Sequence, residues 1–553
     1  MIYSFQDMQT DFADKSPFGI GRLFCSISNS TCRSFLLVAL ILSLLFSARS
    51  FGAGVTVITH GLNGNADGWV TGMANQIPNN SSFPGTGSTF YKIYFYNSGG
   101  SYFATWSRLG GSAPTGTDSG EIVVAFDWSQ LADGNSYNTY QIASVLSSVL
   151  QSSNFISELN GHALAELPLH LIGHSRGGSL MCETSRLLGT NGCWVDHLTT
   201  LDPHPLNNDG FFDFIYSAVD APARTYVNVL FHDNYWQNIA FLVYGEPVSG
   251  AYVRQLFNVP GGYSSEHSDV HLWYHGTVDE RNPASDTEAQ LTSAEFASWY
   301  TAYENYGYNA GFRWSLIGGG NRTSFDLPQG IGYPAVRDGY NQAWSLGAGS
   351  PQNPNRTSLT SNNGKWPNVM RLNLVSTNKA QQGTSALFSL YFQWAQPAAS
   401  NATIRIYLDD DFNPFNGNSH QVQQVNVAGT GTAGTSISYW DSFSPLVAPL
   451  NESNAPAGFH SVYASISGGG RTRYLYAPEI IQILSAPPPI LLSTLSGTNI
   501  VISWSTNSTG FTLQSTTNFA SWISNPPPPV VSGGSYVVTN PVAGGVKFYR
   551  LKK

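Results

Sequence analysis

LPLHLIGHSRGGSL, residues 167–180, is the stretch that decides the fold of the first half of the chain. Its apolar run predicts a buried strand that breaks at Gly173, with Ser175 at the tip of the turn and a helical pattern after it. A serine held at so sharp a turn needs neighbours without side chains two positions away, hence Gly173 and Gly177. Gly-x-Ser-x-Gly between a strand and a helix predicts a nucleophilic serine whose hydroxyl faces a helix N-terminus.

The segments around this turn predict an α/β fold. Buried-strand patterns occupy residues 55–59 and 121–128, residues 139–150 have helical spacing, and residues 197–201 form a further strand after the turn. Strands that alternate with helices favour a mostly parallel sheet covered on both faces. Residues 79–120 and 206–263 are interpreted as variable insertions.

Two aspartates are candidates for the acid that orients a catalytic base. Asp202 ends the strand over residues 197–201, because the proline after it cannot continue a central ladder. That end of an open parallel sheet is where sites are assembled, and we expect Asp202 to be the acid. Asp233, at the end of the next expected strand (227–231), is the alternative.

The base is expected among three histidines, His267, His271 and His275. His267 suits the start of a helix and is favoured, with His271 as its alternative. On a helix the three would share one face and could hold zinc. However, the His-Glu-x-x-His pattern is absent and nothing nearby completes a ligand set, so we expect no metal.

Two backbone N–H groups are needed to stabilise a developing oxyanion. The candidates are the amide of Leu62, which follows the strand and His60-Gly61, and the amide of Arg176, directly after Ser175. His60 is expected to orient its loop rather than to transfer protons.

Taken together, these motifs resemble the lipase group of α/β-hydrolases, and its pancreatic-lipase-like branch especially. The resemblance rests on Thr-His-Gly-Leu at 59–62, Val-Ala-Phe-Asp-Trp at 124–128, the serine motif, Leu-Asp-Pro at 201–203 and a histidine with trailing aromatic residues. It covers roughly residues 54–308, within an expected catalytic domain of residues 54–310.

The resemblance implies a carboxylic ester hydrolase with a lipid or other ester as substrate and no cofactor. Ser175 would be the nucleophile, His267 the base and Asp202 the orienting acid, with an oxyanion hole from the Leu62 and Arg176 amides. The chain lacks the cysteine-rich lid of the animal enzymes. Arg176 also replaces a common apolar or small residue, although only its amide is needed.

Composition and the N-terminus indicate a secreted protein. The formal net charge of −9, with 11% charged residues, gives no basic surface for nucleic acid. The apolar run at residues 35–46 is shorter than the roughly 20 residues that span a bilayer. It suits a signal peptide over residues 1–50, with an uncleaved anchor as the alternative.

Of the four cysteines, Cys25 and Cys32 lie before or within this signal. Cys182 and Cys193 remain, and either form a disulfide or are two buried thiols.

Short alternating runs predict two β-sandwich-like domains after a connecting segment at residues 311–368. The first spans residues 369–486. The second spans residues 490–553, resembles small β-modules that end many secreted bacterial proteins, and could serve secretion, surface attachment or glycan contact. Asp409, Asp411 and Asn413 form either a calcium turn or a hairpin rich in Asx hydrogen bonds.

Substrate and partners stay open at this stage. Aromatic residues between the acid and the base form either a flap over acyl chains or an ordinary cap core (Phe211, Phe212, Phe214, Tyr216, Tyr235, Trp236, Phe241, Tyr244). Besides a lipase or esterase that contacts a lipid interface or a cell surface, two alternatives remain. One is an esterase or amidase acting on a polysaccharide or other polymer, and the other is an inactive surface adhesin.

Overall fold

The computed structural model describes residues 54–79, 87–116, 121–208, 213–240, 243–257, 259–278, 289–301, 311–314, 353–361, 363–397, 399–429, 441–506, 510–524, 528–542 and 544–553. The expected signal peptide lies outside these residues. The described part is mostly β-sheet, in five sheets, with few helices. No helix in it is long and apolar enough to cross a membrane.

An eight-stranded sheet dominates the first half of the chain, in the order β3-β2-β4-β1-β5-β6-β7-β8. All neighbouring strands in it run parallel except β2 and β3. The strands are β1 (Val55–Thr59), β2 (Thr89–Ser98), β3 (Ser101–Gly110), β4 (Ile122–Asp127), β5 (Leu169–His174), β6 (Val195–Leu201), β7 (Val229–Trp236) and β8 (Tyr252–Gln255). The central strands β1, β4, β5 and β6 are buried along their whole length, as parallel strands covered on both faces are.

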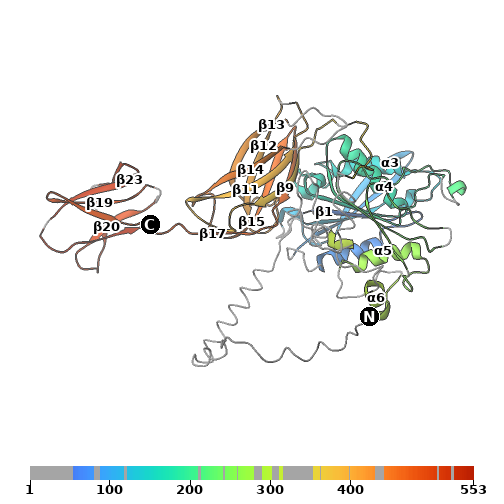
Figure 1. Ribbon diagram of the computed structural model, residues 1–553, viewed down its shortest axis with the longest axis horizontal. Helices are drawn as coiled ribbons and strands as arrows, with labels where there is room; N and C mark the ends of the chain where they lie inside the picture. Colours follow the sequence, from blue (N-terminus) through green and yellow to red (C-terminus); the bar gives the residue numbers. More distant parts are fainter. Residues whose placement is uncertain are drawn as a thin grey trace, which may run out of the picture. The chain divides into compact units, whose positions relative to one another are not determined.

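Helices cover both faces of this sheet (Figure 1). Helices α2 (Trp69–Gln76) and α5 (Glu266–Gly276) pack into one core, and α3 (Thr139–Leu150) and α4 (Arg176–Thr190) pack into the other. Asn138 caps the N-terminus of α3 in a capping box with Gln141, which fixes where the helix starts. The remaining helices are α6 (Ser293–Thr301) and the 3-10 turns η1 (Ile77–Asn79), η2 (Pro114–Gly116), η3 (Ser129–Leu131), η4 (Ser157–Leu159), η5 (Leu164–Glu166), η6 (Asp213–Ile215) and η7 (Gly311–Trp314).

The predicted elements beside the serine turn are confirmed, whereas the two insertions contain more sheet than expected. Strands β2 and β3 lie within residues 79–120, and β8 lies within residues 206–263. Strand β7 continues to Trp236, so Asp233 lies inside the strand and not at its end.

Two sheets packed over one apolar core give the next part of the chain a β-sandwich-like arrangement. One sheet has the order β14-β11-β9, and the other has the order β10-β17-β15-β12-β13 with β16 paired to β15. The strands are β9 (Asn368–Leu374), β10 (Lys379–Gln381), β11 (Thr384–Gln393), β12 (Asn401–Asp409), β13 (His420–Ala428), β14 (Asp441–Leu450), β15 (Gly458–Gly468), β16 (Arg471–Tyr476) and β17 (Ile481–Leu484).

The last part contains two small sheets, β18-β19-β23-β22 and β21-β20-β24. Their strands are β18 (Leu492–Ser496), β19 (Asn499–Ser505), β20 (Thr512–Thr516), β21 (Ile523–Ser524), β22 (Val530–Ser532), β23 (Ser535–Pro541) and β24 (Phe548–Lys552). The buried core here is small: Ile502, Trp504, Leu513 and Val538.

The expected connecting segment packs against the first sheet where it is described. Arg356 donates from Nη1 to the carbonyls of Tyr226 (2.9 Å) and Val229 (2.6 Å). Trp366 belongs to the core around α3 and α4. This stretch therefore forms part of the first globular core and is more than a linker.

The structure shows the state of the two cysteines outside the expected signal peptide. Of the two alternatives for Cys182 and Cys193, the structure has the pair of free, buried thiols. Burial raises the pKa of Cys182 to about 12 and that of Cys193 to about 11, which makes both poor nucleophiles.

The hairpin after β12 has the contacts of the Asx-rich alternative. Asp409 accepts hydrogen bonds from Ser419 Oγ and Tyr476 OH, both at 2.8 Å. Asp411 accepts from the side-chain amides of Asn416 (2.6 Å) and Asn418 (2.8 Å).

Candidate active site

Ser175 occupies the strained turn between β5 and α4, with φ 57° and ψ −128°. Both glycines predicted from the motif are required by close backbone contacts. A Cβ atom on Gly173 would lie 2.1 Å from the carbonyl oxygen of Gly177, and a Cβ on Gly177 would lie 2.4 Å from that of His60. The tight turn leaves Ser175 only 6% exposed, at the N-terminus of α4.

The loop after β1 passes directly against this serine. A Cβ atom on Gly61 would lie 2.6 Å from Ser175 Cβ, so only glycine fits there. His60 holds the loop: its Nδ1–H donates to the Gly61 carbonyl (3.0 Å), its Nε2 accepts from the Trp128 amide (3.2 Å), and its ring stacks on Trp128. This is the orienting role expected for His60.

Both residues expected to supply the oxyanion donors adjoin Ser175: Leu62 follows Gly61, which packs against the serine, and Arg176 follows the serine directly. Leu62 and Arg176 both line the cavity that contains the serine. Within the described residues neither backbone N–H has a hydrogen-bond acceptor, whereas the Asn63 amide donates to Ala132 O (2.9 Å) and the Gly178 amide, two residues after Arg176, donates to Ser175 O (2.9 Å). An unpaired N–H at the first position of a helix is the donor type that such a site uses.

His267 and Asp202 form a short hydrogen bond. His267 Nδ1 lies 2.6 Å from Asp202 Oδ2, so Nδ1–H donates and the neutral ring keeps Nε2 as an acceptor. Asp202 is fully buried and also accepts from the Gln237 backbone amide (2.8 Å) and side chain (2.7 Å). The sequence gives no signal for Gln237, because its contact with Asp202 depends on how β7 continues past its expected end.

Burial sets the charge state of the base. It lowers the pKa of His267 below the usual histidine value, and His204 nearby lowers it further. The ring is therefore neutral at neutral pH and can accept a proton at Nε2.

The alternative acid and base are in different environments. Asp233 accepts from Thr199 Oγ1 (2.6 Å), His197 Nε2 (2.9 Å) and Tyr235 OH (2.9 Å) inside the sheet, so the prediction that it ends a strand is wrong. His271 stacks on Trp69 at 4.3 Å, and its Nδ1 has no partner among the described residues, so no carboxylate orients it there.

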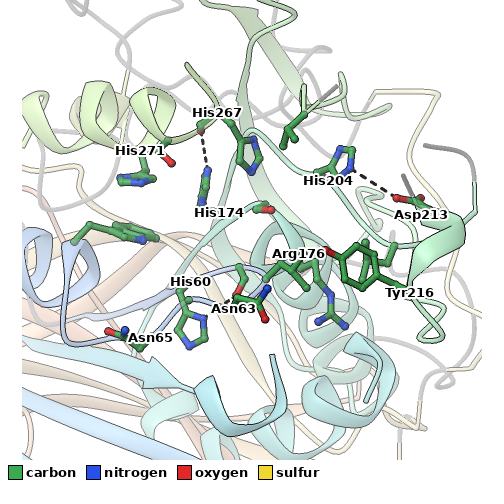
Figure 2. A pocket seen from close by; sticks show the side chains of 18 of the residues that line it. His60, Asn63, Asn65, His174, Arg176, His204, Asp213, Tyr216, His267 and His271 are labelled. Atoms are coloured by element: carbon green, nitrogen blue, oxygen red, sulfur yellow. Dashed lines mark hydrogen bonds and ion pairs between the residues drawn. The ribbon is translucent and has the colours of Figure 1, made fainter. Parts of the chain in front are cut away.

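Ser175 and His267 line one cavity of about 590 Å³, shown in Figure 2. Within the described residues Ser175 Oγ forms no hydrogen bond with His267; such bonds are often long before a substrate tightens them. His174, the last residue of β5, connects this strand to α5, because its Nε2–H donates to the backbone carbonyl of His267 (2.8 Å). This contact spans residues far apart in the sequence and could not be read from the motif.

The side chain of Arg176 is fully buried, a feature the sequence did not indicate. Its guanidinium donates twice to Asp220, at 2.7 and 2.8 Å, and to the Tyr137 carbonyl at 2.9 Å, and it lies over the Trp128 ring. Asp220 also accepts from the Thr139 amide at the start of α3. The residue after the serine thus joins α4, α3 and the loop that carries Asp220.

Of the aromatic residues that could form either a flap or a cap core, one lines the cavity among the described residues. Tyr216 lines the cavity, Phe214 is 74% exposed, and Tyr235 is buried in the core. Phe211, Phe212 and Phe241 lie outside the described residues. In the described ranges no group of three or more histidine, cysteine or acidic side chains could hold a metal ion.

Comparisons with known proteins do not identify a family. No family model matches the chain, and no curated protein matches it. Among solved structures, the CARDB domain of a Pyrococcus furiosus protein, solved in complex with di-metal ions, is similar to part of it. That match has 8% identity and a TM-score of 0.13, and covers 22% of this chain and 97% of that one. A TM-score this low carries no conclusion about fold or function.

Proposed function

We propose that this chain is a secreted serine hydrolase of the α/β-hydrolase fold that cleaves carboxylic esters. The observation that carries the proposal is the 2.6 Å bond between His267 and Asp202, beside a cavity that Ser175 shares with His267. Support also comes from chain order, since Ser175 follows β5, Asp202 follows β6 and His267 lies in the first turn of α5, after β8.

The residues present account for each step of an acyl transfer. Ser175 Oγ attacks the ester carbonyl while its proton passes to His267 Nε2, and the Leu62 and Arg176 amides stabilise the oxyanion. The same proton then passes to the leaving alcohol, and an acyl-enzyme forms. His267 takes a proton from water, which attacks the acyl carbonyl, and Ser175 regains its proton when the acid leaves.

Hydrolysis of p-nitrophenyl acetate tests the proposal. Ser175→Ala should lower kcat by about 10⁴-fold or more. Ser148→Ala, which removes an exposed hydroxyl on α3, is the matched control and should keep full activity. A folded wild-type protein without esterase activity would favour the inactive adhesin instead.

The substrate beyond the ester bond stays a prediction. The lipid expectation comes from the family resemblance, and polymer esters and amides are the alternatives.

A further inference from the structure

The side chain of Arg176 is held in one position by Asp220. Both side chains of this ion pair are fully buried. Nε and Nη2 of the guanidinium donate to the two carboxylate oxygens of Asp220, at 2.7 and 2.8 Å. Two hydrogen bonds to one carboxylate fix the plane of the guanidinium as well as its distance, which the single ammonium group of a lysine cannot do.

Asp220 is itself fixed by the backbone around the cavity. Its carboxylate accepts from the amide of Thr139, the first residue of α3 (2.9 Å), and from the amide of Leu206, which lines the cavity (3.0 Å). The Asp220 amide donates back to the Leu206 carbonyl at 2.7 Å. Arg176 is therefore anchored to the backbone around the cavity and not to an exposed side chain.

One contact leads from this anchored guanidinium to the loop after β1. Nη1 of Arg176 donates to the Ala132 carbonyl at 3.4 Å, and the Asn63 amide donates to the same carbonyl at 2.9 Å. Asn63 directly follows Leu62, whose amide is the second expected oxyanion donor. The guanidinium and the loop that carries this donor thus share one hydrogen-bond acceptor.

A second contact reaches the same loop through two stacked rings. The guanidinium carbon of Arg176 lies 5.2 Å from the centroid of the Trp128 ring, and the Trp128 ring stacks on His60 at 5.0 Å. His60 in turn donates to the Gly61 carbonyl at 3.0 Å. Gly61 directly precedes the second donor, so the chain on both sides of that donor is connected to Arg176.

We infer that Arg176 is a positioning residue for the oxyanion hole: its side chain, held by Asp220, keeps both donors in place, its own amide and that of Leu62. This inference rests on the proposed function, because it concerns the oxyanion that forms when Ser175 attacks an ester. It departs from the expectation that only the Arg176 amide is needed. Donors stabilise a transition state only from the right place, and a displacement of about 1 Å can lower a rate about 100-fold.

Steady-state hydrolysis of p-nitrophenyl acetate by Arg176→Lys tests the inference. Lysine keeps the positive charge but loses the planar, two-bond geometry. We expect kcat and kcat/KM to fall by the same factor, about 10- to 100-fold, because the donors stabilise an oxyanion that the bound ester does not yet carry. The midpoint of the acid limb of the pH profile should not move, because burial and His204 set the lowered pKa of His267.

Arg473→Lys is the matched control. Arg473 is also a buried arginine that donates to an aspartate, Asp196 (2.8 Å), and to a backbone carbonyl, that of Ala165 (2.7 Å), and none of these residues lines the cavity. The same substitution there should lower the urea midpoint of unfolding, while kcat per folded molecule stays at the wild-type value. The comparison separates a loss of stability from a loss of donor placement.

Wild-type kcat in Arg176→Lys, or an equal loss of kcat per folded molecule in the Arg473 control, would overturn the inference while leaving the serine hydrolase intact. A wild-type protein with no esterase activity and no fluorophosphonate adduct on Ser175 would instead overturn the proposed function.

A double variant keeps the inference testable if Arg176→Lys does not fold. Arg176→Met with Asp220→Asn leaves no buried charge unpaired, and the asparagine keeps an oxygen that can accept from the Thr139 amide. This variant should show the same fall in kcat at unchanged KM. Wild-type kcat in the folded double variant would overturn the inference.

Discussion

At the scale of single residues, Asp202 is the side chain on which the proposed chemistry depends most. It is fully buried, and its hydrogen bonds from His267 and Gln237 leave the His267 ring in one tautomer. A carboxylate in this position also stabilises the imidazolium that forms during acyl transfer.

Asp202→Asn should therefore lower kcat by about 10⁴-fold on a soluble ester, because an amide can donate to Nδ1 and hold the wrong tautomer. Asp233→Asn is the matched control, since it also changes a buried aspartate bonded to a histidine. Its kcat per folded molecule, counted by active-site titration, should equal that of the wild type. Loss of activity in the Asp233 variant alone would reverse the assignment.

The pH dependence follows from the state of His267. Burial lowers its pKa below 6.5, and the base works only when neutral, so activity is lost as pH falls through that lowered pKa. The acid limb of kcat/KM should have its midpoint below 6.5. A midpoint above 7 would show that another group, or a charged His267, controls the reaction.

At the scale of elements, the β5–Ser175–α4 turn is fixed by backbone packing. Gly173→Ala would place a methyl group 2.1 Å from the Gly177 carbonyl oxygen. We expect a loss of at least about 2 kcal/mol in unfolding free energy, together with reduced activity. Gly116→Ala, where no atom of the described residues lies within 4 Å of the added Cβ, should change neither quantity in urea unfolding and ester assays.

The elements that could be predicted from sequence are those with strong local signals. Helix α3 has clear periodicity and a capping box, and β5 ends at a glycine that the turn requires. Strand β3 was missed because it lies at the sheet edge and is largely exposed, without a buried apolar face. The predicted end of β7 was wrong, because polar residues after an apolar run suggest that a strand has ended. Here Asp233 and Asn234 stay inside the strand, buried with long-range hydrogen bonds.

In the candidate site, too, only the residues with a local sequence signal could be predicted. Ser175, Asp202 and His267 each stand where a strand ends or a helix begins, and local patterns indicate such positions. The contacts of His174 and of the Arg176 side chain join residues distant in sequence, so no local pattern predicts them.

At the scale of the whole molecule, the first sheet and the β-sandwich-like part share buried contacts. Arg473 on β16 is 2% exposed, lies 2.8 Å from Asp196 on β6, and donates to the Ala165 carbonyl. Trp194 donates from its indole to Gln393 on β11 at 2.9 Å. Such contacts make the two parts stabilise each other.

Arg473→Ala should cost about 3–5 kcal/mol of unfolding free energy, because it leaves Asp196 buried without its cation. Arg405→Ala removes a half-buried arginine on β12 that donates to Gln424, and should cost much less. Tryptophan fluorescence and esterase activity should be lost at the same urea concentration, lower in the Arg473 variant. Two separate transitions, with activity unaffected by Arg473→Ala, would contradict this coupling.

Fluorophosphonate labelling of the purified protein, with the modified residue mapped by mass spectrometry, decides whether Ser175 is an activated nucleophile. We expect a single adduct on Ser175, absent in Ser175→Ala and much slower to form in His267→Ala. An adduct on another serine, or none on the folded wild-type protein with or without detergent, would contradict it.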